Sequence, residues 1–447
     1  MDAATRYRLD NVGTFYAAQA GSPVQTVFRF SAAMADAVDA AALQAALDDT
    51  VTLFPSFNVC LRSGLFWHYL EPAAKAPSAQ PEVLPICFGL HTGHRSTLFR
   101  VSWHEQRINL EVSHMISDGR GSLEFFRTLV GLYAQHRYGA PYEGALGQAA
   151  AEARSQQAED SFSRHYDRRS AAATRSVRAW RLPGLRDQAR PTFMEYHLPA
   201  GRVHQWARSM GVSVTSLIIA AVICAVRAEM PARDRNRPIR LDVPVDLRQF
   251  FDSSTMRNFF GLAFVSHTPG PHDEPLDAVA AQVQQQILAG CTADAMKGRM
   301  NRMVALEKNP ILRMAPLFVK DLALAVGARI AARDVTTTVS SLGRVELPAS
   351  AAPLVRSVSV LTSTTGLNFV ACTFGDDLSL GISTVFRNLA VVRNLCRIFA
   401  GQGIEGRIDI NQDARQVSHR LHEMRLADTL HQMSTVRKGR GGHAHLR

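Results

Sequence analysis

The sequence predicts an α+β (mixed α/β) protein whose two halves each carry a mixed sheet. Alternating apolar runs joined by short polar turns recur as hairpins in both parts of the chain, which is typical of antiparallel or mixed sheets and not of a doubly wound parallel sheet. A stretch rich in Ala, Gln, Ser and Arg, with few large apolar residues and no clean period, separates these parts. At 447 residues the chain is also too long for one ordinary core.

Composition sets the predicted boundaries. Residues 1–140 form the N-terminal half, 141–190 a linker or crossover, and 191–430 the C-terminal half. Residues 431–447 are basic and glycine-rich, which predicts a disordered tail.

In the first half, strands and helices alternate. Alternating apolar residues predict a strand over 24–30, and Asp39 is placed to cap an Ala/Leu helix that reaches Thr50. An apolar series at helical spacing predicts a helix over 121–138. Two hairpins lie between these elements, and they pair 57–61 with 65–70 and 98–103 with 107–112.

The second half repeats this alternation. Its predicted strands cover 192–198, 239–245, 335–340, 355–361, 367–374 and 378–386, and the stretch 258–267 is apolar and interrupted by glycine. Its predicted helices cover 201–210, 213–229, 277–304, 311–332 and 388–400. Ser213 is the expected N-cap of a helix so apolar that it must be buried.

Composition also bounds the compartment and the partners. No apolar run is long enough to span a bilayer, and the first residues lack the apolar core of a signal peptide. Six scattered cysteines without a CxxC pair suit a reducing cytoplasm, so a soluble cytoplasmic protein is expected. The net charge of +11 favours an anionic partner, although a basic solvated surface explains it equally well. The basic residues are not interleaved with aromatic ones, so no nucleic-acid partner is predicted.

The segment Glu111–Gly119 carries the chemistry. It places His114 at the end of an apolar strand, Asp118 four residues later and Gly119 just before an amphipathic helix. Histidine is the natural general base near neutral pH. Asp118 either orients the imidazole or pairs with a distant arginine and braces the loop, and Gly119 permits backbone conformations that other residues resist. A buried structural histidine is the alternative reading.

Further segments give this motif a context. Pro244–Arg248, Arg257–Gly261 and Thr338–Gly343 follow His114-x-x-x-Asp118-Gly119 in order. Together these segments resemble the CoA-dependent acyltransferase superfamily, which includes chloramphenicol acetyltransferase, condensation domains and alcohol acetyltransferases. The stretches 8–11 and 64–70 resemble its bacterial alcohol-acetyltransferase-like and condensation-domain-like branch. The resemblance implies two chloramphenicol-acetyltransferase-like halves packed side by side around a central channel.

The resemblance also implies a reaction. His114 would deprotonate an alcohol or amine, which attacks the carbonyl of an acyl thioester. Asp118 would be structural and paired with Arg248. The donor would be acyl-CoA or a phosphopantetheine thioester as co-substrate, with no permanently bound cofactor and no metal. Because two fused halves can build the whole channel, a monomer is expected.

Other positions receive weaker roles from the same resemblance. Asn258 and Gly261 would line the channel near the acceptor, and Ser340 or Ser341 would donate to the oxyanion. Ser113 stands where condensation domains usually carry a first histidine, which disfavours peptide formation. Two alternatives stay open: a condensation-type acyltransferase that uses a carrier protein, and a non-catalytic protein that binds through the same cleft.

Overall fold

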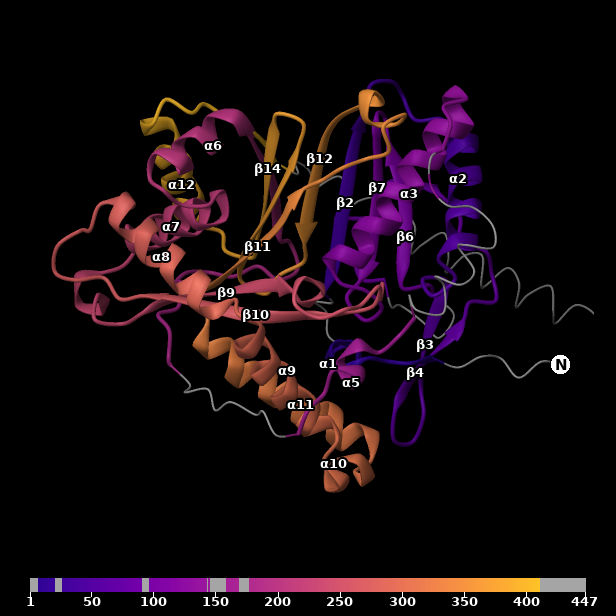
Figure 1. Cartoon of the computed structure of the whole chain (residues 1–447), viewed down its shortest axis with the longest axis horizontal. Helices are drawn as coiled ribbons and strands as arrows, with labels where there is room; N and C mark the ends of the chain where they lie inside the picture. Colours follow the sequence, from indigo (N-terminus) through magenta and orange to yellow (C-terminus); the bar gives the residue numbers. More distant parts are fainter. Residues whose placement is uncertain are drawn as a thin grey trace, which may run out of the picture.

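Figure 1 shows the computed structural model, which describes residues 7–20, 26–90, 96–142, 144, 158–168 and 177–410. Within this part the chain forms two lobes, each with its own sheet and helices, as the predicted mixed α/β class requires. The predicted tail, 431–447, lies outside the described residues, and so do 143, 145–157 and 169–176 of the predicted linker.

The first lobe is built on a five-stranded sheet in the order β12-β2-β7-β6-β5. Its strands are β2 (Val27–Met34), β5 (Gln80–Pro81), β6 (Phe99–His104), β7 (Arg107–Ser113) and β12 (Val355–Thr362). Helices α2 (Ala40–Leu53) and α3 (Gly119–Tyr138) pack together against this sheet (Figure 1). A small sheet of β1 (Tyr7–Arg8), β4 (His68–Pro72) and β3 (Val59–Ser63) lies below it in the view.

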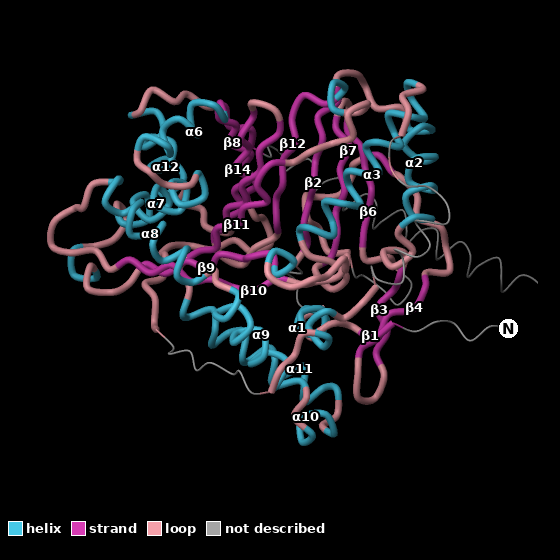
Figure 2. Tube along the Cα trace, in the orientation of Figure 1, coloured by secondary structure: helices cyan, strands magenta, loops and turns pink. Residues whose placement is uncertain are grey.

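The second lobe contains a seven-stranded sheet in the order β10-β9-β11-β13-β14-β8-β15. Its strands are β8 (Thr192–Pro199), β9 (Ile239–Asp246), β10 (Phe260–His267), β11 (Thr337–Arg344), β13 (Leu367–Phe374), β14 (Asp377–Thr384) and β15 (Arg407–Ile410). Strand β11 runs parallel to β9 and β13, and the other pairs are antiparallel, so the sheet is mixed. Figure 2 shows α6 (Ala200–Ser209), α7 (Val214–Arg227), α8 (Leu276–Gly290) and α12 (Ala390–Gly401) gathered at its outer side.

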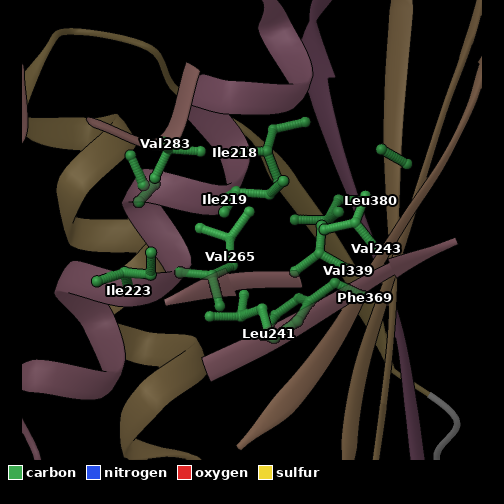
Figure 3. Packing of buried hydrophobic residues seen from close by; sticks show 14 of the residues in the cluster. Ile218, Ile219, Ile223, Leu241, Val243, Val265, Val283, Val339, Phe369 and Leu380 are labelled. Carbon is green, nitrogen blue, oxygen red and sulfur yellow. The ribbon is translucent and has the colours of Figure 1, made fainter. Parts of the chain in front are cut away.

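Helix α7 is the centre of the second core. The Ser213 hydroxyl accepts a hydrogen bond from the Ser216 amide and caps the helix, as predicted. Ile218, Ile219 and Ile223 are at most 1% exposed, and Figure 3 shows them packed among residues of the sheet such as Leu241 and Val265. A helix that is apolar all round must be buried, and α7 satisfies that requirement.

The division of the sequence is not the division of the sheets. Strand β12 belongs to the second half of the sequence, yet it pairs antiparallel with β2 of the first lobe, with Val360 opposite Phe30. The first core accordingly includes Val358 and Val370 beside residues of the N-terminal half. Residues 355–362, assigned by composition to the second half, therefore complete the first lobe.

Several predicted elements differ in extent. The helix expected over 277–304 is two helices, α8 and α9 (Ala293–Glu307), and the one over 311–332 is α10 (Pro310–Met314) and α11 (Leu317–Ala331). Helices α1 (Asn11–Ala17) and α5 (Ser161–Arg164) were not predicted. The 3-10 turns are η1 (Ala232–Asp234), η2 (Leu247–Gln249), η3 (Ala332–Asp334) and η4 (Ala352–Leu354).

Among the described residues, no single helix has the length and apolar content needed to cross a membrane, and the pair α6–α7 passes such a test only jointly, with an 85° bend between its members.

Candidate active site

Asp118 joins three segments behind the motif. Its Oδ1 accepts a hydrogen bond from the Gly121 amide at 2.9 Å and so caps α3. Its Oδ2 accepts from Arg248 Nη1 at 2.9 Å and from the Phe259 amide at 2.8 Å. The carboxylate is thus fully used by protein groups, and the ion pair with Arg248 that the sequence predicted is present. This geometry makes Asp118 a brace and leaves none of its bonds to His114.

Arg248 connects Asp118 to the segment before Asn258. Its guanidinium also pairs with Asp246 at 2.9 Å and donates to the carbonyl oxygens of Thr255 and Arg257. Burial lowers the pKa of Arg248, but the charges of Asp118 and Asp246 outweigh that effect and raise it. The guanidinium stays charged and fixes the loop that leads to Asn258.

The glycines of the motif act through close packing and not through unusual backbone angles. Gly119 does not have a positive φ, which corrects the expectation that it permits an unusual conformation. A Cβ at Gly119 would lie 3.0 Å from a methyl of Leu342. A Cβ at Gly121 would lie 2.1 Å from the Met256 carbonyl oxygen, so Gly121 is the position that admits no side chain.

His114 follows β7 and lies among aromatic rings. Its backbone amide donates to the Thr26 carbonyl at 3.0 Å, and the residue is 6% exposed. The ring stacks on Tyr16 with centroids 4.3 Å apart, and the rings of Phe28 and Phe260 lie 4.6 Å and 5.3 Å away. Burial lowers the pKa of His114 to about 4, so the imidazole is neutral at pH 7.

A buried amide fixes the tautomer of His114. Asn258 Nδ2 donates to the Asp10 carboxylate at 3.2 Å and to the His114 carbonyl at 3.0 Å. Because both partners are acceptors, the other end of this amide, Oδ1, must face the imidazole, and it lies 2.8 Å from His114 Nδ1. Nδ1 therefore carries the proton, and Nε2 keeps a free lone pair. That is the form a general base requires.

Asp10 accepts the hydrogen bond from the Asn258 amide. It caps α1 through the Gly13 amide and lies 3.5 Å from Arg257 Nε. Burial raises the pKa of Asp10 to about 6 although the charge of Arg257 opposes the shift. The sequence predicted no role for Asp10 or Tyr16. The family-like stretch 8–11, which contains Asp10, was the only pattern that pointed to this region.

Asn258 differs from its prediction. It was expected to line the channel beside the acceptor, but it is 1% exposed and its polar atoms bond protein groups. Gly261 lies near the start of β10, where a Cβ would lie 2.8 Å from Met296 Sδ, and its place beside the acceptor stays a prediction. Phe259 is fully buried, whereas Phe260 contacts the His114 ring.

Ser340 and Ser341 lie on β11, opposite Val370 and Ala371 of β13. The register of β11 shifts between Ser341 and Gly343, where Leu342 reaches Gly119 at the start of α3. The strand thus ends beside the motif, and an oxyanion role for either hydroxyl stays a prediction.

Another carboxylate, that of Asp242, lies near Tyr16. Asp242 is on β9, and its Oδ1 has no hydrogen-bond partner among the described residues. Burial raises the pKa of Asp242 to about 6, while a hydrogen bond from Thr338 opposes the shift. Burial, and next the charge of Asp242, raise the pKa of the Tyr16 hydroxyl. No sequence pattern pointed to Asp242.

Replacing Asn258 by alanine is expected to lower kcat by about tenfold to a hundredfold with little change in KM, since the imidazole loses the partner that fixes its tautomer. Asn258 also raises the pKa of His114, so the acidic limb of the pH profile should move to lower pH. Steady-state kinetics across pH checks this result. A purely structural role would reduce the amount of folded protein and leave the pH limb in place.

Comparisons with known proteins agree with this architecture. Residues 199–383 match the family model of the phthiocerol/phthiodiolone dimycocerosyl transferase C-terminus. No curated protein matches the chain.

Three solved structures share the fold across both lobes. One is polyketide synthase associated protein 5 from Mycobacterium tuberculosis, with a TM-score of 0.57, 13% identity, and coverage of 88% of this chain and 96% of that chain. Another is the first condensation domain of the calcium-dependent antibiotic synthetase in complex with a substrate analogue. It has a TM-score of 0.58 and 16% identity, and the match covers 90% of this chain and 97% of that chain. A third is a point mutant of the starter condensation domain of rhizomide synthetase in complex with C8-CoA. It has a TM-score of 0.58 and 12% identity, and the match covers 89% of this chain and 94% of that chain.

At these identities the structural likeness shows the fold, and the family match is confined to residues 199–383. The chain therefore has the fold of polyketide synthase associated protein 5 and of condensation domains, and its residues 199–383 are similar to the C-terminal part of the dimycocerosyl transferase family.

Proposed function

We propose that this protein transfers an acyl group from an acyl thioester to an alcohol or amine, with His114 as the general base. The observation that carries the proposal is the Asp10–Asn258–His114 chain of hydrogen bonds, which leaves Nε2 of a neutral imidazole unprotonated.

In the proposed reaction the His114 imidazole both accepts and returns the proton. Nε2 takes the proton of the acceptor while its oxygen or nitrogen attacks the thioester carbonyl, giving a tetrahedral oxyanion. Collapse of this intermediate breaks the C–S bond, and the thiolate receives the proton from the imidazolium. Because burial disfavours the charged ring, the imidazolium gives its proton up readily.

Both substrates must reach Nε2 past the rings that enclose it. Tyr16 and Phe260 come from α1 and from the start of β10, so they are held by separate segments of the chain. We infer that substrate binding displaces at least one of these rings. Ser340 and Ser341 remain the proposed oxyanion donors.

Free acyl-CoA is the donor that we propose first. The net charge of +11 suits the phosphates of CoA, and one solved structure of this fold is a complex with C8-CoA. The same charge suits an acidic carrier protein, and the condensation-domain fold favours this donor as the second candidate.

The test is thiol release from a panel of acyl-CoAs and acyl-phosphopantetheine carriers, each offered with alcohol and amine acceptors. Formation of an ester or amide together with free thiol supports the proposal. Binding of a ligand without turnover of any donor would instead support the non-catalytic alternative.

A further inference from the structure

Helix α11 is an apolar helix that the described part of the chain leaves largely exposed. None of its residues is buried. Phe318, Leu322, Val326 and Ile330 recur every four residues and are 73%, 66%, 45% and 55% exposed. This spacing places the four side chains along one face, over a length of about 18 Å.

The β3–β4 hairpin extends this face. Leu65 and Phe66 at its tip are 83% and 45% exposed. The Leu317 amide donates to the Leu65 carbonyl, and Lys320 Nζ donates to the Phe66 carbonyl, both at 3.0 Å. Lys320 Nζ also lies 3.6 Å from the centroid of the Trp67 ring. The hairpin tip and the start of α11 are therefore fixed side by side.

We call the combined surface the apolar ridge. It consists of Leu65, Phe66, Met314, Phe318, Leu322, Val326 and Ile330. Figure 1 shows α10 and the hairpin at the lower edge of the molecule, where they project from both lobes. A projecting ridge does not offer the concave wall that usually receives a small molecule. Contiguous exposed apolar surface of this kind marks an interaction site.

Positive charge surrounds the apolar ridge. Arg313, Arg329 and Arg333 are exposed, and none of them forms an ion pair within the part of the chain that the structure describes. Residues 313–334 carry four basic side chains (Arg313, Lys320, Arg329 and Arg333) against two acidic ones (Asp321 and Asp334), so positive charge predominates on this stretch. Long basic side chains beside an apolar face extend their charges to the polar headgroups of a lipid layer while the apolar face enters it.

We propose that the apolar ridge docks this protein reversibly on an anionic lipid surface. The apolar side chains enter the boundary between headgroups and acyl chains, and the three arginines contact lipid phosphates. The ridge combines exposed apolar side chains with exposed arginines, so an anionic lipid layer is the occupant that its apolarity and charge fit. The proposal is independent of acyl transfer and requires no membrane-spanning segment.

The test is sedimentation of the whole protein with vesicles. One set contains phosphatidylcholine alone, and the other contains three parts phosphatidylcholine and one part phosphatidylglycerol. We expect binding to the anionic set, weakened as NaCl rises from about 0.1 M to about 0.5 M. The double variant Phe318→Ser, Leu322→Ser should lower the partition coefficient at least about tenfold. The matched control is Leu185→Ser, Leu288→Ser, which changes two leucines that are 74% and 63% exposed outside the ridge.

Both pairs of positions are on the surface, so all variants should keep the thermal unfolding temperature of the wild type or exceed it. Equal binding of wild type and the ridge variant, or no binding of the wild type to anionic vesicles, overturns the proposal. If light scattering shows a wild-type dimer and a monomeric ridge variant, the ridge binds a second copy of the chain, and the lipid proposal is overturned. The lipid proposal is also overturned if the wild type binds an acidic carrier protein and not vesicles, and the ridge variant loses that binding.

Discussion

Replacing His114 by alanine is expected to lower kcat/KM for acyl transfer by about 10²–10⁴-fold, the usual contribution of a general base. The loss should fall mainly on kcat, because the ring accepts a proton only as the tetrahedral intermediate forms. Residual activity is expected from positioning of the two substrates. The measurement is thiol release at saturating donor and acceptor. A matched control is His136→Ala, which removes a half-exposed histidine paired with Asp49 near the end of α3.

The pH profile separates a buried base from an ordinary histidine. The unprotonated imidazole is the active form, so kcat/KM falls as pH drops through the pKa of His114. Burial lowers that pKa to about 4, so activity should persist well below the value near 6.5 at which a solvated histidine would lose it. An inflection near pH 6 that disappears in Asp10→Asn belongs to Asp10, whose pKa burial raises to about 6. A limb near 6.5 that persists in both Asp10→Asn and Asp242→Asn would contradict the buried state of His114.

Local patterns predicted the elements that hold the site. Asp39 and Ser213 cap their helices as expected, because capping depends on residues within one turn of each other. The strand before His114 and the helix after Asp118 were likewise visible as alternation and helical spacing. The ion pair of Asp118 with Arg248 spans 130 residues, and it was predicted from the family-like segment and not from any local rule.

Contacts between distant segments were beyond the sequence. Asn258 serves His114 instead of a substrate because its amide meets Asp10, 248 residues earlier in the chain. Nothing in the sequence near either residue encodes that contact. Strand β12 joined the first lobe for a similar reason, since strand pairing partners are not set by the alternation that identifies a strand. Asp242 went unnoticed because a single acidic residue in a strand gives no pattern.

Replacing Arg248 by alanine is expected to lower the free energy of unfolding by about 3–5 kcal/mol, the usual cost of removing one partner from a buried ion pair. Asp118 is 4% exposed, so its charge would lose its main partner without gaining water. The Thr255 and Arg257 carbonyl oxygens would lose their donor as well. Chemical denaturation followed by circular dichroism measures the change.

The chain contains a matched control for this variant. Arg137 pairs with Asp39, which caps α2 just as Asp118 caps α3, but both members of that pair are exposed to solvent. Arg137→Ala should therefore change the stability little. If the two variants lose equal stability, the buried brace does not hold the motif. Asp118→Asn in the Arg248→Ala background should recover part of the loss, because it removes the unpaired charge while keeping a side-chain oxygen for the Gly121 amide. Recovery of stability without recovery of kcat would show that the brace also sets the geometry of His114.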